Sequence, residues 1–261
     1  MKGGRREPRY ARWSGIEREL RRSGVLLIAG VDEVGRGSLA GPVVASAVIM
    51  PPGVPALRGV DDSKRLTRKE REKLCVRIRE RALALGVGAA SVREIDTLNI
   101  FHASVLAMRR ALSRLALRPD HVLVDGRRLK TLGVDHTAVI DGDAKCFNVA
   151  CASIVAKVIR DRLMARLATR YPDFAWASNC GYGTADHVHG LTRRGPTVHH
   201  RRLFVAAVEA RLRAGASLED AGEIVIPGVV AESTFAPTHV SVESVECGPA
   251  DAASPQISRV Q

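Results

Sequence analysis

The chain has 261 residues, with 40 Lys and Arg against 28 Asp and Glu, a formal net charge of +12 and a pI near 10.2. This length is sufficient for one sizeable domain with its own core. The apolar runs are shorter than the roughly 18–20 residues that a membrane-spanning helix needs. The charged N-terminus also lacks the apolar segment of a secretory signal. We therefore expect a cytoplasmic protein that does not use a membrane as a partner.

The charge is distributed unevenly along the chain. Residues 1–24 carry eight basic and three acidic side chains, whereas residues 217–261 carry seven acidic and one basic side chain. The main part of the chain is therefore strongly basic, which favours a polyanionic partner such as nucleic acid. The five cysteines form no C-x-x-C pair, and their odd number indicates free thiols rather than disulfides or a zinc site.

The first half of the chain contains strand and helix patterns in turn. Thr67 and Glu70 have the spacing of a capping box and predict a helix that ends near residue 85. Short apolar runs predict strands on both sides of this helix, over residues 25–31, 43–50 and 86–92.

A second helix is predicted by a stripe of apolar side chains. They recur at steps of three and four residues, as Leu98, Phe101, Val105, Met108, Leu112 and Leu115, and predict one buried face. Later patterns predict strands over 121–125 and 137–141 and helices over 147–171 and 204–214. Strands that come first and then alternate with helices favour an α/β fold with a mixed sheet.

Carboxylates stand at three predicted strand or helix ends. Asp32 and Glu33 follow the first apolar run, Asp125 ends a later one, and Asp143 precedes the long helix. Carboxylates at the ends of buried strands are costly unless a positive charge neutralises them. Clustered carboxylate oxygens suit Mg²⁺ or Mn²⁺. For any one of these residues taken singly, a carboxylate that only caps a turn remains the alternative.

An ordered series of motifs resembles the bacterial type 2 ribonucleases H, the ribonuclease HII enzymes. It begins with AGVDEVGRGSLAGPVV at 29–44 and continues with DSK at 62–64, EID at 94–96, LNI at 98–100, VDG at 124–126, DAK at 143–145, ASIVAK at 152–157 and GYGT at 181–184. The resemblance implies a ribonuclease-H-like fold, an α/β fold whose mixed sheet is flanked by helices, with a small helical C-terminal part. We expect this catalytic domain over residues 25–214, between a basic N-terminal arm at 1–24 and an acidic tail at 215–261.

The resemblance also implies an activity. It is that of an endoribonuclease that hydrolyses the RNA strand of RNA–DNA hybrids and cuts 5′ of ribonucleotides embedded in duplex DNA, which supports ribonucleotide excision, DNA replication and repair. The family's catalytic, metal-binding carboxylates fall on Asp32, Glu33, Asp125 and Asp143. They imply two divalent ions, Mn²⁺ or Mg²⁺, in each active site with substrate. The resemblance further implies that cleavage leaves a 5′-phosphate and a 3′-hydroxyl, and two divalent ions can activate the water and stabilise the leaving 3′-oxygen.

Substrate-binding residues follow from the same resemblance. The family's Gly-Arg-Gly loop and its tyrosine imply contacts to the 2′-hydroxyl that distinguishes RNA from DNA, and they fall on Gly35, Arg36, Gly37 and Tyr182. Lys64 is predicted to contact a phosphate, and the run His199–Arg202 is interpreted as a basic surface for the nucleic-acid backbone. Nothing in the sequence suggests an oligomer interface, so we expect a monomer.

Two other functions remain open at this point. A resolvase-like or transposase-like DNA nuclease would share the fold and the acidic cluster, but it would not need a device that detects a 2′-hydroxyl. A non-catalytic nucleic-acid-binding module would use the basic surface alone. Cleavage of an all-DNA duplex would favour the first alternative, and binding without cleavage in any metal would favour the second.

Overall fold

The computed structural model describes residues 15–52, 56–61 and 63–223. Five strands form one sheet in the order β3-β2-β1-β4-β5. Their bounds are β1 Ile28–Val34, β2 Val43–Ile49, β3 Ala84–Ala90, β4 His121–Asp125 and β5 Thr137–Val139. The central strand β1 pairs antiparallel with β2 and parallel with β4. The sheet is therefore mixed, as the sequence predicted.

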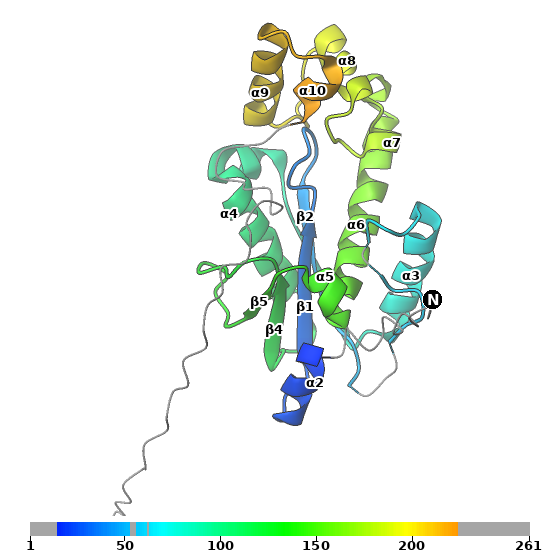
Figure 1. The fold of residues 1–261 in the computed structure, drawn as a ribbon, viewed down its shortest axis with the longest axis vertical. Helices are drawn as coiled ribbons and strands as arrows, with labels where there is room; N and C mark the ends of the chain where they lie inside the picture. Colours follow the sequence, from blue (N-terminus) through cyan, green and yellow to red (C-terminus); the bar gives the residue numbers. More distant parts are fainter. Residues whose placement is uncertain (1–14, 53–55, 62, 224–261) are drawn as a thin grey trace, which may run out of the picture. The chain divides into compact units, whose positions relative to one another are not determined.

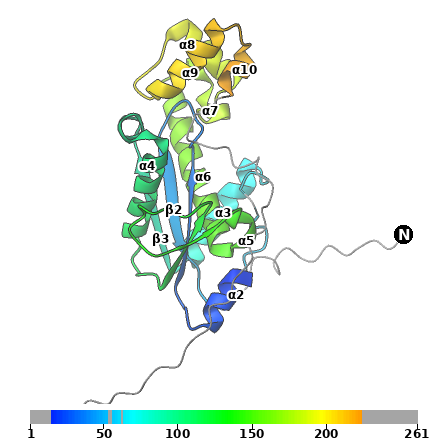
Figure 2. The ribbon, with the colours of Figure 1, turned by 60° about the vertical axis from the view of Figure 1, so that its left-hand side comes forward.

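Helices cover both faces of this sheet, and the four that pack around it are α3 Arg68–Arg81, α4 Val92–Ser113, α5 Gly142–Lys145 and α6 Phe147–Ala168. Helix α4 packs against β2 and β3, whereas α6 packs against β1 and β2 and carries α3 on its outer side (Figures 1 and 2). Because both faces are covered, every residue of β2 is buried. A strand that is buried on both faces needs no alternation of apolar and polar residues, and this explains the continuous apolar run in the sequence there.

Strand β1 starts three residues later than its apolar run predicted. The main-chain N–H groups of Leu26 and Leu27 donate to Asp120 Oδ2 and not to a neighbouring strand. Helix α3 begins after the predicted capping box, in which the Thr67 hydroxyl and the Glu70 carboxylate accept from each other's backbone. It ends at Arg81, earlier than predicted, because the chain turns extended at Ala82 and pairs with β2 from Ala84 onward.

The predicted apolar stripe of α4 is wrong at its first two positions. Leu98 is 39% exposed and Phe101 is 36% exposed, whereas Val105 and Met108 are buried. The cause is a kink at Asn99, whose φ of 69° breaks the helix. The Asn99 side chain accepts from the N–H of His102, so a new helical segment starts there with a different face toward the sheet.

The small helical C-terminal part is present and larger than predicted. It consists of η1 Pro172–Phe174, α7 Trp176–Asn179, α8 Ala185–Arg194, α9 Arg202–Arg213 and α10 Leu218–Gly222. Helix α10 lies in the segment assigned to the acidic tail from residue 215, so that boundary is wrong. The Ser217 hydroxyl accepts from the Asp220 N–H at the start of α10, and Ala221 is fully buried against α8 and α9. The rest of the predicted tail, residues 224–261, lies outside the described residues.

The predicted N-terminal arm contains helix α2, Gly15–Arg22, and residues 1–14 lie outside the described part. Glu17 is 6% exposed and accepts from the N–H of Asn148, so α2 is attached to the start of α6. Within the described ranges, no helix is long and apolar enough to cross a membrane. The cysteines at 75, 146, 151 and 180 are free thiols, as expected, and Cys247 lies outside the described residues.

Candidate active site

The sheet topology brings two predicted carboxylates to the same end of adjacent strands. Val31 of β1 lies opposite Val124 of β4 in parallel register. Asp32 and Asp125 are the next residues on these strands, so they lie side by side at the carboxyl end of the strand pair. Asp125 is held in place by the N–H of Gly142, which donates to its Oδ1 at 2.6 Å.

The charges of three predicted carboxylates act on the fourth, Asp32. Asp32 is 6% exposed. Burial raises its pKa well above the usual 3.8, and the negative charges of Glu33, Asp125 and Asp143 raise it further. Asp141, the near neighbour of Asp143, is exposed and pairs with Lys145 at 3.8 Å instead. The structure thus gathers the four residues that the sequence singled out.

Glu33 follows Asp32 along β1, and adjacent strand residues point to opposite faces. The Glu33 N–H donates to Asp32 Oδ1 at 2.7 Å, while the Glu33 carboxylate pairs with the Arg36 guanidinium at 3.1 Å. Arg36 therefore lies beside the acidic cluster and partly neutralises it.

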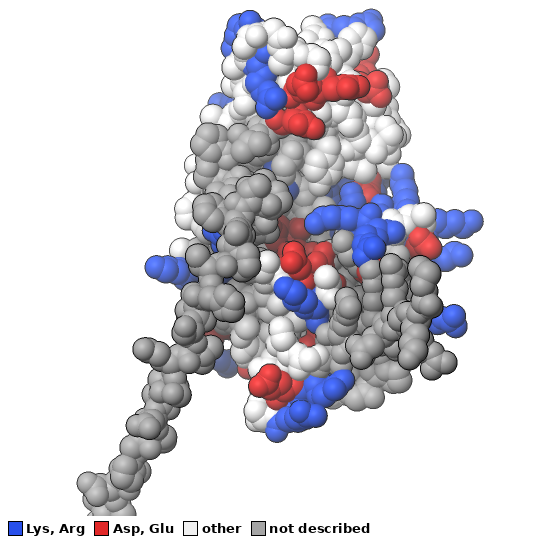
Figure 3. Space-filling view, viewed as in Figure 1, with Lys and Arg blue, Asp and Glu red and all other residues white. Residues whose placement is uncertain are grey.

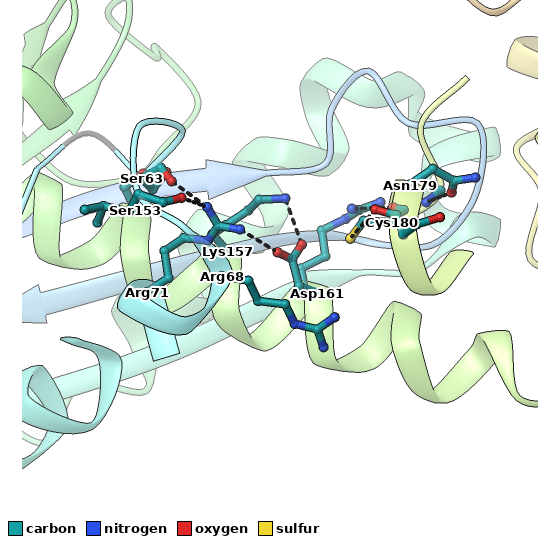
Figure 4. Close-up of polar contacts among 12 residues, drawn as sticks. Ser63, Arg68, Arg71, Ser153, Lys157, Asp161, Asn179 and Cys180 are labelled. Carbon is teal, nitrogen blue, oxygen red and sulfur yellow. Dashed lines mark hydrogen bonds and ion pairs between the residues drawn. The ribbon is translucent and has the colours of Figure 1, made fainter. Parts of the chain in front are cut away.

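A pair of hydroxyl groups lies behind Asp32 on the α6 side. Ser153 donates a hydrogen bond that lowers the pKa of Asp32, against the larger effect of burial. Its Oγ lies 2.9 Å from the Oγ of Ser63 (Figure 4). Both serines are at least 95% buried. The segment before α3, which contains Lys64, is thereby attached to the carboxylate cluster.

A buried acid on α6 connects helix α3 with the surroundings of Tyr182 in the Gly-Tyr-Gly motif. Asp161 on α6 pairs with Lys157 at 2.8 Å and with Arg71 of α3 at 3.6 Å (Figure 4). The Lys157 ammonium lies 5.7 Å from the centre of the Tyr182 ring. Ser153 and Lys157 lie one helical turn apart, a spacing that a Ser–Lys nucleophilic pair would have, but Ser153 contacts Ser63 and Lys157 pairs with Asp161 instead.

The two glycines of the Gly-Arg-Gly loop differ in their surroundings. Gly35 is buried with a φ of +89°, and a Cβ there would lie 2.0 Å from Arg160 Nε. Glycine at 35 is thus required by the packing of the protein itself. Gly37 is exposed, and a Cβ there would meet nothing within 4 Å. Of the two, only Gly37 leaves open space for a ligand.

Exposed basic side chains gather at the start of α3, close to the acidic cluster. They belong to Lys64, Arg65, Arg68 and Lys69. Figure 3 shows Lys and Arg side chains over this part of the surface, next to Asp and Glu side chains at the centre of the same face. Lys64, the residue predicted to contact a phosphate, is one of these exposed basic side chains.

The predicted basic surface at 199–202 is wrong for its two central residues. His200 is 4% exposed and Arg201 is fully buried. His200 forms part of a network that the sequence pattern did not reveal. Its Nε2 lies 3.0 Å from Nε2 of His187, which also accepts from the indole N–H of Trp176 at 3.0 Å. The members come from separate segments, so no local spacing signals their contact.

The tautomers of this histidine pair follow from their partners. The Tyr182 carbonyl can only accept, so His187 Nδ1, 2.8 Å away, carries the proton. His200 Nδ1 accepts from the Thr197 N–H at 2.9 Å, so His200 donates through Nε2 to His187. Burial lowers the pKa of His187 to about 4 and that of His200 to about 3, so both are neutral near pH 7.

The acidic cluster is not a closed ligand set as it stands. In residues 15–52, 56–61 and 63–223, no group of three or more His, Cys, Asp and Glu side chains forms a ready-made metal site. Glu33, Asp125 and Asp143 are close enough for their charges to affect Asp32. Asp32, whose pKa is raised, and the three acids around it nevertheless supply the oxygen donors that hard divalent cations prefer.

Comparisons with known proteins match most of the folded part. The sequence model of the family described as Ribonuclease HII matches residues 29–207. A ribonuclease HII of Granulibacter bethesdensis is 56% identical over 182 residues, which covers 68% of this chain and 83% of that protein. One of Paraburkholderia xenovorans is 48% identical over 201 residues, covering 77% and 81%. A chain from the PCNA–ribonuclease HII complex of Archaeoglobus fulgidus superposes with a TM-score of 0.58 at 26% identity, covering 73% and 96%.

Proposed function

Because the chain belongs to the ribonuclease HII family, we propose that Asp32, Glu33, Asp125 and Asp143 form its catalytic centre. The family assigns the reaction class: the protein is a hydrolytic endoribonuclease that cuts the RNA strand of RNA–DNA hybrids. The observation that carries the site is that Asp32 is buried among the other three acids: burial raises its pKa, and the charges of Glu33, Asp125 and Asp143 raise it further.

The four carboxylates would hold two divalent ions, Mg²⁺ or Mn²⁺, together with the substrate phosphate. Such ions activate a water molecule and stabilise the leaving 3′-oxygen. Asp32 and Asp125 stand at adjacent strand ends and are the residues best placed to contact both ions. Glu33 and Asp143 complete the acidic wall, and the Gly142 N–H fixes the orientation of Asp125.

Recognition of the ribose is assigned to the loop Gly35–Arg36–Gly37 and to Tyr182. A 2′-hydroxyl both donates and accepts a hydrogen bond, so main-chain groups of the loop and the phenol of Tyr182 can bind it at the same time. The open space beside Gly37 supports a close approach of the sugar to the backbone there. The cut would then fall 5′ of the ribonucleotide, including a single one embedded in duplex DNA. This activity suits ribonucleotide excision during DNA replication and repair.

Contacts to the nucleic-acid backbone are assigned to Lys64 and, secondarily, to Arg36. Lys64 belongs to the exposed basic surface at the start of α3. Arg36 is paired with Glu33 at 3.1 Å, so it would contact a phosphate at the edge of the acidic cluster. We infer a monomer that acts in the cytoplasm, where its nucleic-acid substrates are found, without a membrane partner.

A cleavage assay tests this function. The substrates are a labelled DNA duplex with one embedded ribonucleotide and its all-DNA twin, each with Mn²⁺, Mg²⁺ or EDTA. We expect one metal-dependent cut at the DNA–RNA junction, no cut in the twin, and a loss of about 10³-fold or more in Asp125→Asn. Equal cutting of both duplexes would favour the resolvase-like alternative. Binding without any cleavage would favour the non-catalytic module.

A further inference from the structure

Two arginines are fully buried near the proposed recognition loops. Arg160 lies on α6, and Arg201 is the residue before α9. Burial lowers the pKa of both, and that of Arg201 falls to about 9. A buried charge is costly unless its hydrogen-bonding capacity is satisfied. The partners of these two guanidinium groups therefore indicate what they do.

Both guanidinium groups donate to main-chain carbonyls. Arg201 makes four such bonds of 2.6–3.0 Å, and Arg160 makes three of 2.8–3.1 Å. The acceptors for Arg201 are Gly35, Arg36 and Gly41, and those for Arg160 are Ala40, Pro42 and Cys180. All but Cys180 lie in the segment 35–42, which contains the Gly-Arg-Gly loop.

The same bonds connect this segment to the Gly-Tyr-Gly motif. Arg160 bonds the Cys180 carbonyl, and its guanidinium carbon lies 5.5 Å from the centre of the Tyr182 ring. The Gly181 carbonyl in turn accepts from the N–H groups of Leu39 and Ala40. The two proposed ribose-reading elements, which are about 145 residues apart in the chain, are thereby held against each other.

A planar guanidinium suits this task because its five N–H groups point in fixed directions. One such group sets the spacing of several carbonyls that belong to no strand or helix. A lysine would keep the positive charge, but its donors radiate from a single nitrogen. The geometry of the loops therefore depends on the planar arrangement of the guanidinium N–H groups and not only on the positive charge.

We propose that Arg160 and Arg201 are positioning residues for ribose recognition. They fix the backbone of Gly35–Gly37 relative to Tyr182, so that one 2′-hydroxyl meets both elements at once. This inference rests on the proposed function of those two elements. A purely structural role would instead lower stability and affect ribose-containing and all-DNA duplexes equally.

The test measures binding, so that loss of catalysis cannot mask the result. All proteins carry Asp125→Asn to prevent cleavage, and Mg²⁺ is present. Two fluorescent duplexes that differ by a single 2′-hydroxyl are titrated, and the ratio of their Kd values is the readout. Arg201→Lys and Arg160→Lys are compared with Arg162→Lys, an exposed arginine on the same helix as Arg160. Circular dichroism and Tm confirm the fold of each variant.

We expect the protein with both arginines to prefer the ribose-containing duplex. Arg201→Lys and Arg160→Lys should each reduce this preference at least about fivefold, the size of one hydrogen bond, and change the Kd of the all-DNA duplex less than twofold. Arg162→Lys should leave the preference unchanged. A folded Arg201→Lys or Arg160→Lys variant that keeps the full preference, or that loses affinity for both duplexes equally, overturns the proposal.

A second measurement avoids substitution altogether. The N–H groups of Leu39, Ala40 and Gly41 are hydrogen-bonded within the protein. Hydrogen exchange of the free protein should therefore show protected peptides over 35–42 and 180–182. Rapid exchange there would refute pre-positioned loops even if the lysine variants do not fold.

The two levels of inference fail in different ways. If the protein with both arginines binds the two duplexes equally, the assignment of ribose recognition to Gly35–Gly37 and Tyr182 is wrong, and the proposed positioning role is wrong as well. If that protein discriminates and the folded lysine variants discriminate as well, the proposed function stands and only the positioning role is lost.

Discussion

Acidification from pH 7 to pH 5 should destabilise the protein through the buried pair His187 and His200. In the folded chain their pKa values are about 4 and about 3, because burial disfavours the charged rings and His200 also feels His187 and His199. In the unfolded chain each titrates near 6.5. Below pH 6.5 the unfolded state therefore takes up protons that the folded state does not, and stability falls as the pH falls toward those lower values.

The size of this effect follows from the interval between pH 6.5 and pH 5. At about 1.36 kcal/mol for each pH unit, each histidine reduces the free energy of unfolding by about 2 kcal/mol, and the pair by about 4 kcal/mol. Asp32 acts in the opposite sense, because a raised carboxyl pKa stabilises the fold at low pH and this contribution is lost as the pH rises. A comparison of variants that all retain Asp32 cancels its contribution.

The assay is urea unfolding at pH 7, 6 and 5 for the wild type, His187→Gln and His189→Gln. His189 is exposed on the same helix and provides the matched control. We expect His187→Gln to be less stable at pH 7, but to lose about 2 kcal/mol less than the wild type on acidification. His189→Gln should follow the wild type. Equal acid sensitivity of all three proteins would refute the assignment of neutral, buried rings.

Two further predictions concern the proposed active site. Asp32→Asn should abolish cleavage and yet raise the free energy of unfolding by on the order of 1 kcal/mol at pH 7, because burial and three neighbouring acids oppose the ionisation of Asp32; a lower Tm would contradict this. Gly35→Ala should lower the free energy of unfolding by about 1–3 kcal/mol, because φ at this position is +89° and the new Cβ would clash with Arg160. Gly37→Ala should leave the free energy of unfolding within about 0.5 kcal/mol of the wild type, but it should reduce cleavage of ribose-containing duplexes. Urea unfolding and the cleavage assay separate the two glycines, and equal losses of stability would count against the distinction.

The sequence was most informative where local pattern and chemistry agree. The capping box at Thr67 and the run ending at Asp125 depend on neighbours within a few residues, and both are confirmed. The proximity of Asp32 to Asp125 could be anticipated as well, because parallel strands bring their carboxyl ends to one edge. The proposed site residues were identified from carboxylates at predicted strand ends and from the ordered motifs of the family resemblance, and the sheet places two of them, Asp32 and Asp125, side by side.

The errors arose where distant segments decide a residue's surroundings. His200 and Arg201 were expected on the surface because they follow each other in a basic run. Their partners His187, Gly35 and Gly41 lie 13 to 166 residues away, and no periodicity encodes those contacts. The apolar stripe of α4 was predicted wrongly for a different reason. Asn99 has a left-handed backbone conformation, and this single residue changes which face of α4 packs against the sheet.

The order of strands in the sheet has a consequence for synthesis on the ribosome. Strands β1, β2 and β3 pair antiparallel in chain order and are complete once residue 90 has emerged, but β1 meets β4 only after residue 125. Until then β1 is an edge strand whose residues 28–32 are buried in the finished protein. Such an edge can pair with another nascent chain. A slow stretch of translation between residues 90 and 121 would therefore increase aggregation, and the proposed catalytic centre would assemble only when the second half of the chain arrives.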